Sequence, residues 1–223
     1  MIMKNYSYIW ISLIVLVFGI YFVPKIVDRF KNATVVESDR LNVANRHDLL
    51  VVGKAPAFSF TDQNNNTITN KDYEGKVYLV EFFFSTCPTI CPIMNENMVK
   101  LQNEFGKDDR FAIASITIDP TTDTPEHLKE HAEFLGATIP NWHFLTGNEE
   151  ETFALSKQFS LYVGKNDDAP GGFEHSGLFA LIDKKGNIRT RDIRVNGDYP
   201  YYDGTMDEGL KMLKEDIQQL LKE

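Results

Sequence analysis

The sequence is poor in cysteine, in clustered basic residues and in repeats. It has only two cysteines among 223 residues, so a framework of several disulfides is excluded. The formal net charge is −9, and basic residues cluster only in short pairs such as Lys184-Lys185. This argues against a nucleic-acid partner, because phosphate binding needs a concentrated basic surface. With 43% hydrophobic residues and no low-complexity segment, the chain fits one globular domain with an appendage.

One segment near the start lacks charge altogether. Asp, Glu, Lys and Arg are all absent between Asn5 and Pro24, and residues 8–23 are mostly large and apolar. Roughly 20 helical residues, at about 1.5 Å each, cover the ~30 Å of a bilayer's hydrocarbon layer. Because no small-x-small cleavage site follows, we expect residues 1–24 to be a retained transmembrane anchor rather than a signal peptide.

The flanking charges do not decide on which side of the membrane the rest of the chain lies. Lys25, Arg29 and Lys31 outnumber Lys4, and the positive-inside rule would then favour a cytoplasmic domain. A domain that carries a thiol pair is instead typical of compartments where disulfides persist. We therefore expect a single-pass protein of the cell membrane with its soluble domain on the extracytoplasmic, periplasmic side.

Residues 25–50 lack sustained periodicity and are expected to form a linker, followed by a folded domain over residues 51–223. Apolar runs predict strands at 76–84, 111–118 and 142–145. Helices are predicted at about 90–103, after the N-cap Thr124 with Pro125 at the first helical position, and after Asn148. The alternation of strands and helices implies parallel pairing.

The ends of this domain carry hairpin and capping signals. Lys184-Lys185-Gly186 separates predicted strands at 176–182 and 187–193, and another hairpin is expected around residues 64–66. The capping box Thr205-Met206-Asp207-Glu208 precedes a final helix with one apolar stripe. The order predicts an α/β, thioredoxin-like fold with an N-terminal hairpin extension, preceded by one transmembrane helix.

Both cysteines lie where the first predicted strand gives way to a helix, in Phe84-Ser-Thr-Cys87-Pro-Thr-Ile-Cys91-Pro92. A thiolate there feels the helix dipole, which lowers its pKa and makes it a better ligand or nucleophile. The spacing of four places both sulfurs on one face if that turn is helical. A structural disulfide or a pair of core thiols is the alternative, and the flanking prolines disfavour it.

Two thiolates alone do not specify a metal. Structural zinc normally takes four ligands, and no second pair of Cys or His completes such a set, whereas thiolate-rich sites with three ligands favour Cu(I). The third ligand would come from the five histidines. His175 follows the flexible stretch 169–172 at an edge of the sheet where loops gather beside the Cys-bearing helix. Its position alone fits an ordinary surface or core histidine equally well.

Three short segments carry a more specific signal together than each does alone. They are Cys87-Pro-Thr-Ile-Cys91-Pro92, Ser115-Ile-Thr-Ile-Asp119-Pro120, and His175-Ser176 ahead of Leu178-Phe-Ala-Leu-Ile-Asp183-Lys-Lys-Gly186. In this order they resemble the Sco (SenC, PrrC) family of copper-binding cytochrome c oxidase assembly proteins, over residues 51–223. The resemblance implies a thioredoxin fold, an N-terminal anchor, and one copper ion, Cu(I) or Cu(II), held by Cys87, Cys91 and His175.

The resemblance also implies partners. It suggests delivery of copper to, or reduction of cysteines in, the CuA centre of cytochrome c oxidase, so the expected partners are subunit II of that oxidase and other copper chaperones. Many relatives carry Asp directly before the histidine, where this chain has Glu174. The carboxylate is kept, so we expect Glu174 to tune the site rather than abolish it.

Two further acids are candidates for supporting the site. Glu81 lies six residues before Cys87 in an apolar strand, at the position of the buried thioredoxin acid that shuttles a proton; a paired or strand-end acid is the alternative. Asp119 ends the next strand on the same edge and either hydrogen-bonds to the site or is a turn residue. Met94 and Met98 are expected in the core, and His127 and His131 on a solvated helix flank.

Other function classes remain open. An extracytoplasmic thiol–disulfide oxidoreductase, with Cys87 and Cys91 as its redox pair, would more usually have C-x-x-C spacing and would not need His175. A peroxidase would usually carry Thr where this chain has Phe84. A tethered interaction domain with incidental thiols is a third class. We expect a metallochaperone rather than a turnover enzyme.

Overall fold

The computed structural model describes residues 16, 18, 21–23, 49–191 and 200–223, and its contacts divide the chain into two units, Met1–His47 and Asp48–Glu223. Most of the expected anchor and linker lies outside the described residues. Among the residues that are described, no helix is both long and apolar enough to cross a membrane. The fold described below is that of the second unit.

Among the described residues, a nine-stranded sheet runs in the order β1-β10-β9-β4-β5-β6-β2-β3, with β11 paired to β9. Its strands are β1 (Leu50–Lys54), β2 (Ser59–Asp62), β3 (Thr67–Thr69), β4 (Val77–Phe83), β5 (Phe111–Thr117), β6 (Trp142–Thr146), β9 (Leu178–Ile182), β10 (Asn187–Thr190) and β11 (Tyr202–Asp203). A separate two-stranded sheet pairs β7 (Val163–Lys165) with β8 (Phe173–His175). The neighbours β4, β5 and β6 are parallel, whereas β9 is antiparallel to β4.

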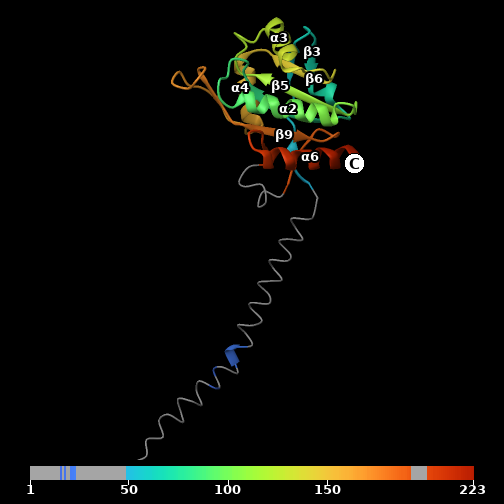
Figure 1. Ribbon diagram of the computed structural model, residues 1–223, viewed down its shortest axis with the longest axis vertical. Coiled ribbons are helices and arrows are strands. Elements are labelled where there is room, and N and C mark those ends of the chain that lie inside the picture. Colours follow the sequence, from blue (N-terminus) through green and yellow to red (C-terminus); the bar gives the residue numbers. More distant parts are fainter. Residues whose placement is uncertain (1–15, 17, 19–20, 24–48, 192–199) are drawn as a thin grey trace, which may run out of the picture. The chain divides into compact units, whose positions relative to one another are not determined.

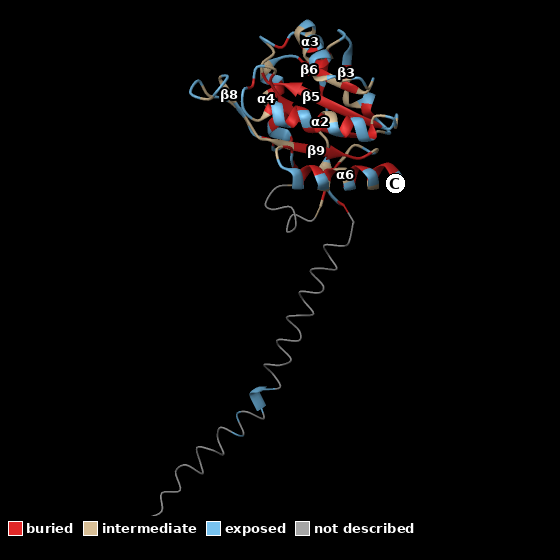
Figure 2. Ribbon diagram, viewed as in Figure 1, coloured by how far each residue is buried: buried red, intermediate tan, exposed pale blue. Residues whose placement is uncertain are grey.

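The parallel strands β4 and β5 form the centre because both are continuous buried runs. Parallel strands need cover on both faces, and such runs supply apolar side chains to both. Figure 2 shows β5 and β9 buried along most of their length. Since β4 and β5 pair in the same direction up to Phe83 and Thr117, the segments that follow both strands meet at one edge of the sheet.

The described helices are α2 (Cys91–Phe105), α3 (Pro125–Leu135), α4 (Glu149–Gln158), α6 (Asp207–Lys222) and the short 3-10 helix η1 (Asn70–Tyr73). Helix α2 lies across the face of the sheet that is turned towards the viewer in Figure 1. Its buried stripe includes Met94 and Met98, which confirms their expected place in the core. Thr124 caps α3 as predicted by accepting a hydrogen bond from the backbone N–H of His127.

Both predicted hairpins form, β2–β3 and β9–β10, the second with Gly186 at φ +73°. The predicted capping box of α6 is wrong. The N-cap of α6 is Met206, whose side chain makes no capping hydrogen bond. The Thr205 hydroxyl donates instead to the carboxylate of Asp203, the last residue of β11, at 2.6 Å. Strand β1 begins at Leu50, one residue before the expected start of the domain. Strands β1, β7, β8 and β11 were not predicted.

Candidate metal centre

The two cysteines are held at the junction between β4 and α2. Cys91 is the first residue of α2, and Cys87 lies in the preceding loop, where its backbone N–H donates to the carbonyl of Phe84 at 3.2 Å. Both are free thiols, with exposed fractions of 7% for Cys87 and 2% for Cys91. The local fold therefore places two sulfurs near the positive end of a helix, shielded from bulk water.

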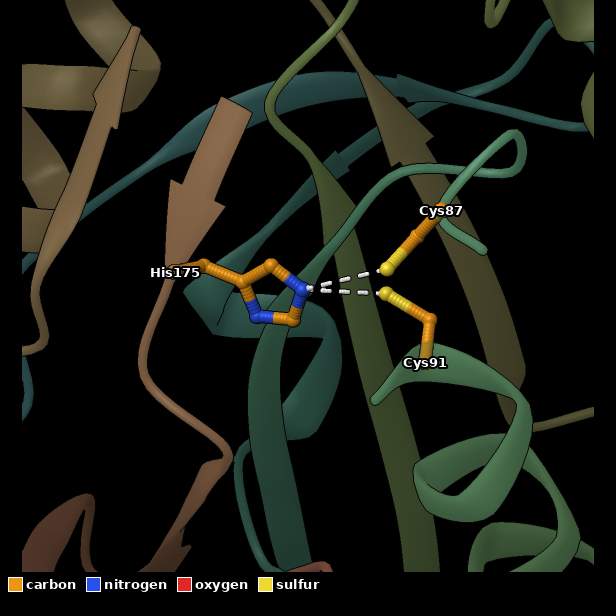
Figure 3. A group of neighbouring side chains, drawn as sticks. All are labelled: Cys87, Cys91 and His175. Carbon is orange, nitrogen blue, oxygen red and sulfur yellow. Dashed lines mark hydrogen bonds between the residues drawn. The ribbon is translucent and has the colours of Figure 1, made fainter. Parts of the chain in front are cut away.

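The imidazole of His175 reaches both sulfurs from the end of β8. Its Nε2 lies 3.0 Å from Sγ of Cys91 and 4.0 Å from Sγ of Cys87, and Figure 3 shows both sulfurs pointing at this nitrogen. Its Nδ1 lies 3.2 Å from the carbonyl oxygen of Ser176. A carbonyl oxygen can only accept a hydrogen bond, so Nδ1 carries the proton, and in the neutral imidazole Nε2 then presents its lone pair to the sulfurs.

The β7–β8 hairpin is fixed to the cysteine loop through Phe84. The ring of Phe84 contacts the rings of Phe173 and His175, with centroids 5.4 Å and 5.8 Å apart. Gly171 has φ +85°, and a Cβ there would come within 2.7 Å of the Phe84 ring. A glycine is therefore required where the hairpin loop crosses Phe84. Helix α2 and strand β8 are far apart in sequence. The packing of the hairpin on the Phe84 ring therefore brings His175 to the thiols.

The two thiols are unequal. The thiol of Cys91 donates to the sulfur of Cys87 and so lowers the pKa of Cys87, with further help from Thr89 and against the effect of burial. The same hydrogen bond and burial raise the pKa of Cys91. Cys87 therefore ionises first, and its thiolate is the better nucleophile or first ligand.

Glu81 is fully buried inside β4, which excludes the strand-end alternative, and its hydrogen-bond partner among the described residues is Ser115 rather than a lysine. Burial raises its pKa to about 7, although the hydroxyl of Ser115, which donates to it at 2.6 Å, acts in the opposite direction. Its other carboxyl oxygen has no hydrogen-bond partner. Glu81 also raises the pKa of Cys91 electrostatically, so it lies close enough to sense the charge of the thiol site.

The other two predicted acids do not reach the sulfurs through any described hydrogen bond. Asp119 accepts from the backbone N–H of Thr122 and so acts as a turn residue. Glu174 is exposed and accepts from Tyr162 and Asn166, which ties together the two strands of the β7–β8 hairpin. Glu174 therefore supports the element that carries His175 rather than the metal ligands directly.

Sequence reasoning missed Asp123, which is fully buried. Its carboxylate accepts hydrogen bonds from the backbone N–H and the hydroxyl of Ser85 and from the hydroxyl of Thr117. It thereby joins the cysteine loop to the end of β5. The only sequence signal was its position four residues after Asp119, and that spacing suits a cap or a turn equally well.

The expectation of a solvated flank is wrong for His131, whereas the side chain of His127 is 41% exposed. His131 packs against the rings of Phe83 and Phe144, and burial lowers its pKa. His127 is half-buried, with Nε2 3.0 Å from the hydroxyl of Ser85. The side chains turn inward because α3 packs on β6 and reaches the cysteine loop. Neither histidine belongs to the cluster that could hold a metal.

The donor set itself is suited to a soft metal ion. The ligand atoms of Cys87, Cys91 and His175 all lie within 4.8 Å of one another, and among the described residues no other such cluster of three occurs. Two thiolates and one imidazole match the preferences of Cu(I) and Cu(II) better than those of Mg²⁺ or Ca²⁺, which take oxygen ligands. The same two sulfurs lie within 4.8 Å of each other, whereas a disulfide bond is about 2.05 Å long, so oxidation would require them to move together.

Comparison with known proteins agrees with this geometry. The sequence profile of SCO1/SenC matches residues 52–195. The chain belongs to the SCO1/SenC family. The matched region contains both cysteines and His175, so the whole candidate site lies within the part of the chain that defines the SCO1/SenC family.

Two relatives and one solved structure illustrate the similarity. The SCO1 protein homolog of Bacillus subtilis is 33% identical over 150 residues, which cover 66% of this chain and 76% of the relative. A candidate copper-binding protein of Stutzerimonas stutzeri is 30% identical over 138 residues, 60% of this chain and 66% of the relative. The structure of BsSco, a Sco-family cytochrome c oxidase assembly protein with a disulfide switch, superposes with a TM-score of 0.64 at 26% identity, covering 78% of this chain and 96% of BsSco. The thioredoxin-like α/β fold predicted from the element order is therefore confirmed.

Proposed function

We propose that this protein is a copper metallochaperone that binds one copper ion per chain through Cys87, Cys91 and His175. The observation that carries this proposal is the convergence of two buried sulfurs and one tautomer-fixed imidazole nitrogen on a single point. Its support from relatives is the S. stutzeri protein named for copper binding. The inequality of the two thiols gives an order of ligation, with Cys87 deprotonated first.

Copper loading in this proposal depends on the oxidation state of the cysteine pair. When reduced, the pair supplies two thiolates, and when oxidised to a disulfide it supplies none. We expect the fold to accommodate both states, because the ligand atoms lie within 4.8 Å of one another and the loop that carries Cys87 precedes α2 rather than being part of it. Redox conditions thereby control whether the protein carries its cargo.

The recipient that we propose is the CuA centre in subunit II of cytochrome c oxidase, with other copper chaperones as donors. The support is that BsSco is described as a cytochrome c oxidase assembly protein. The uncharged segment at residues 8–23 would anchor the chain in the cell membrane, with the domain on the periplasmic side, where this centre could be reached.

The decisive experiment is anaerobic titration of the reduced full chain with Cu(II), followed by absorbance of the thiolate-to-Cu(II) charge-transfer band. We expect saturation at one copper per chain. Replacing His175 by Ala removes the imidazole ligand, and we expect Cu(II) affinity to fall by about 100-fold or more. His143→Gln is the matched control, because His143 pairs with Asp62 and is not part of the thiol cluster. Equal affinity in the wild type and His175→Ala would exclude His175 as a ligand.

A thiol–disulfide oxidoreductase is the second candidate, favoured by the lowered pKa of Cys87 beside a second thiol. In that reaction the Cys87 thiolate would attack a partner disulfide, and Cys91 would then release the reduced partner as the Cys87–Cys91 disulfide forms. Turnover of disulfides without tight copper binding in the same titration would favour this function over the first.

A further inference from the structure

A cavity of about 370 Å³ opens beside the thiols between α2 and α3. We call this cavity the α2–α3 groove, and its lining includes Cys87, Cys91, Asn95, His131, Phe134 and Leu135. His175 is not among its lining residues and instead lines a separate cavity with Cys87. The sulfurs can therefore be approached through the groove without passing the imidazole.

Two residues that line the groove each carry a buried polar atom without a partner in the described structure. Asn95 is only 5% exposed, and its Oδ1 makes no hydrogen bond. The Nε2 atom of His131 is also buried and has no hydrogen-bond partner. A buried polar atom without a hydrogen bond destabilises a fold, so it calls for an explanation. The amide oxygen of Asn95 can only accept, which means that the missing partner is an N–H or O–H donor.

Part of the groove lining is apolar and exposed, next to the exposed carboxylate of Glu96. Phe134, near the end of α3, is 86% exposed, although phenylalanine side chains are usually buried in folded proteins. Leu135 and Val99 lie beside it in the lining. The groove thus combines an apolar surface, a buried hydrogen-bond acceptor and two reactive sulfurs.

We propose that the α2–α3 groove docks an extended, cysteine-bearing segment of the partner polypeptide, whose backbone N–H donates to Oδ1 of Asn95 and whose apolar side chain packs on Phe134. A polypeptide segment meets all three features at once, whereas a small thiol supplies no apolar side chain for Phe134. The inference rests on the proposed function, because both copper transfer and disulfide exchange require a partner ligand to reach Cys87 and Cys91.

The test is a comparison of two disulfide probes with the reduced full chain. One probe is the disulfide-linked dimer of acetyl-Gly-Leu-Cys-Leu-Gly-amide, and the other is 2-hydroxyethyl disulfide, which has no peptide bond. With either probe, a thiolate of the chain attacks one sulfur and releases a thiolate. The second cysteine then closes the Cys87–Cys91 disulfide and releases the other thiol, so the chain is oxidised by two electrons and the probe is reduced by two.

We expect Phe134→Ala and Asn95→Leu each to lower the rate with the peptide probe by about 5–10-fold, while the rate with 2-hydroxyethyl disulfide stays unchanged. Phe134→Ala alters an exposed side chain and leaves the core intact, so it remains informative even if Asn95→Leu folds poorly. Ile93→Ala is the matched control, since Ile93 is an exposed apolar residue of α2 outside the groove lining.

Other outcomes would overturn the proposal. Equal slowing with both probes would mean that the groove affects thiol reactivity rather than docking, and no slowing with either would mean that it docks nothing. Sedimentation that shows a dimer in the wild type and a monomer in Phe134→Ala would assign the groove to a second copy of this chain. Copper titration separates the two proposals, because a wild type that binds no copper would refute the metallochaperone while the peptide-probe rates would still report on the groove.

Discussion

At the scale of single residues, the most consequential side chain apart from the ligands is Glu81. It is an ionisable group with no exposed surface, placed in the central strand and only partly satisfied by Ser115. Burial without a countercharge favours the neutral carboxylic acid. Near neutral pH the group can therefore hold or release a proton beside the thiols, as the sequence comparison with thioredoxins suggested.

This burial makes a prediction about stability. The folded-state pKa of Glu81, about 7, lies above its ordinary value of 4.5. The unfolded chain therefore loses this proton first as pH rises, so native stability falls from about pH 4.5 and the full penalty is present above pH 7. Gln stays neutral at every pH. The unfolding free energy of Glu81→Gln, relative to that of the wild type, should therefore rise by about 3 kcal/mol as the pH increases from 4.5 to 8.

Denaturant unfolding of the reduced protein at the two pH values measures this difference. Glu96→Gln is the matched control, because Glu96 is exposed on α2 and is paired only with Lys100. A gain of equal size at pH 4.5 and pH 8 for Glu81→Gln would show that the carboxyl is not neutralised by burial.

At the scale of elements, the site depends on how the β7–β8 hairpin packs on the β4–α2 junction. This hairpin is a separate two-stranded sheet, yet it carries His175. Its crossing over Phe84 requires Gly171, where an added Cβ would lie 2.7 Å from the ring. Gly172 has a similar φ of +81°, but an added Cβ there would meet nothing within 4 Å.

The pair of glycines separates steric contact from backbone strain. Both Gly171→Ala and Gly172→Ala suffer the strain of a positive φ, but only Gly171→Ala should push the hairpin away from Phe84. We expect Gly171→Ala to weaken Cu(II) binding about tenfold more than Gly172→Ala. Thermal unfolding of the apo proteins should change by similar amounts in both, since the main sheet does not include this hairpin. Equal copper affinities would mean that Phe84 does not position His175.

The elements differ in how far sequence could predict them. The buried strands β4 and β5, the start of α2 and the cap at Thr124 follow from local patterns, because burial on both faces and capping leave signals in neighbouring residues. Strands β7 and β8 are three residues each and too short for periodicity. The α6 capping box failed because Asp203, close in sequence but outside the pattern, competed for the hydroxyl of Thr205.

The residues of the site also differ in how far sequence could predict them. The strand-to-helix junction indicated the poised thiols, but the approach of His175 depends on contacts across 84 residues and came only from family resemblance. For the same reason the sequence pointed to Asp119 and missed Asp123. Both follow β5, and only the three-dimensional path of the chain shows that Asp123 turns inward to Ser85 while Asp119 stays in its turn.

At the scale of the whole molecule, two signals disagree about which side of a membrane the domain occupies. The positive flank at Lys25, Arg29 and Lys31 favours the cytoplasm, whereas a redox-controlled thiol site favours an oxidising compartment. We expect the chemistry to decide, because the charge rule describes a tendency and three charges are a modest bias.

The two native cysteines make this expectation testable with one label. In the Cys87→Ser, Cys91→Ser background no thiol remains, and Met206→Cys then adds a single thiol at a position that is 58% exposed. In intact cells whose outer membrane has been permeabilised, we expect a membrane-impermeant maleimide to label this variant in full. The background without Met206→Cys, and a cytoplasmic enzyme in the same cells, should stay unlabelled. Deletion of residues 1–24 should move the domain from the membrane fraction to the soluble fraction, since roughly 20 apolar residues account for its anchoring. Labelling that appears only after lysis would place the domain in the cytoplasm. A reduced thiol pair there could bind copper, but disulfide formation could not control it. The redox part of the proposed function would then have to be abandoned.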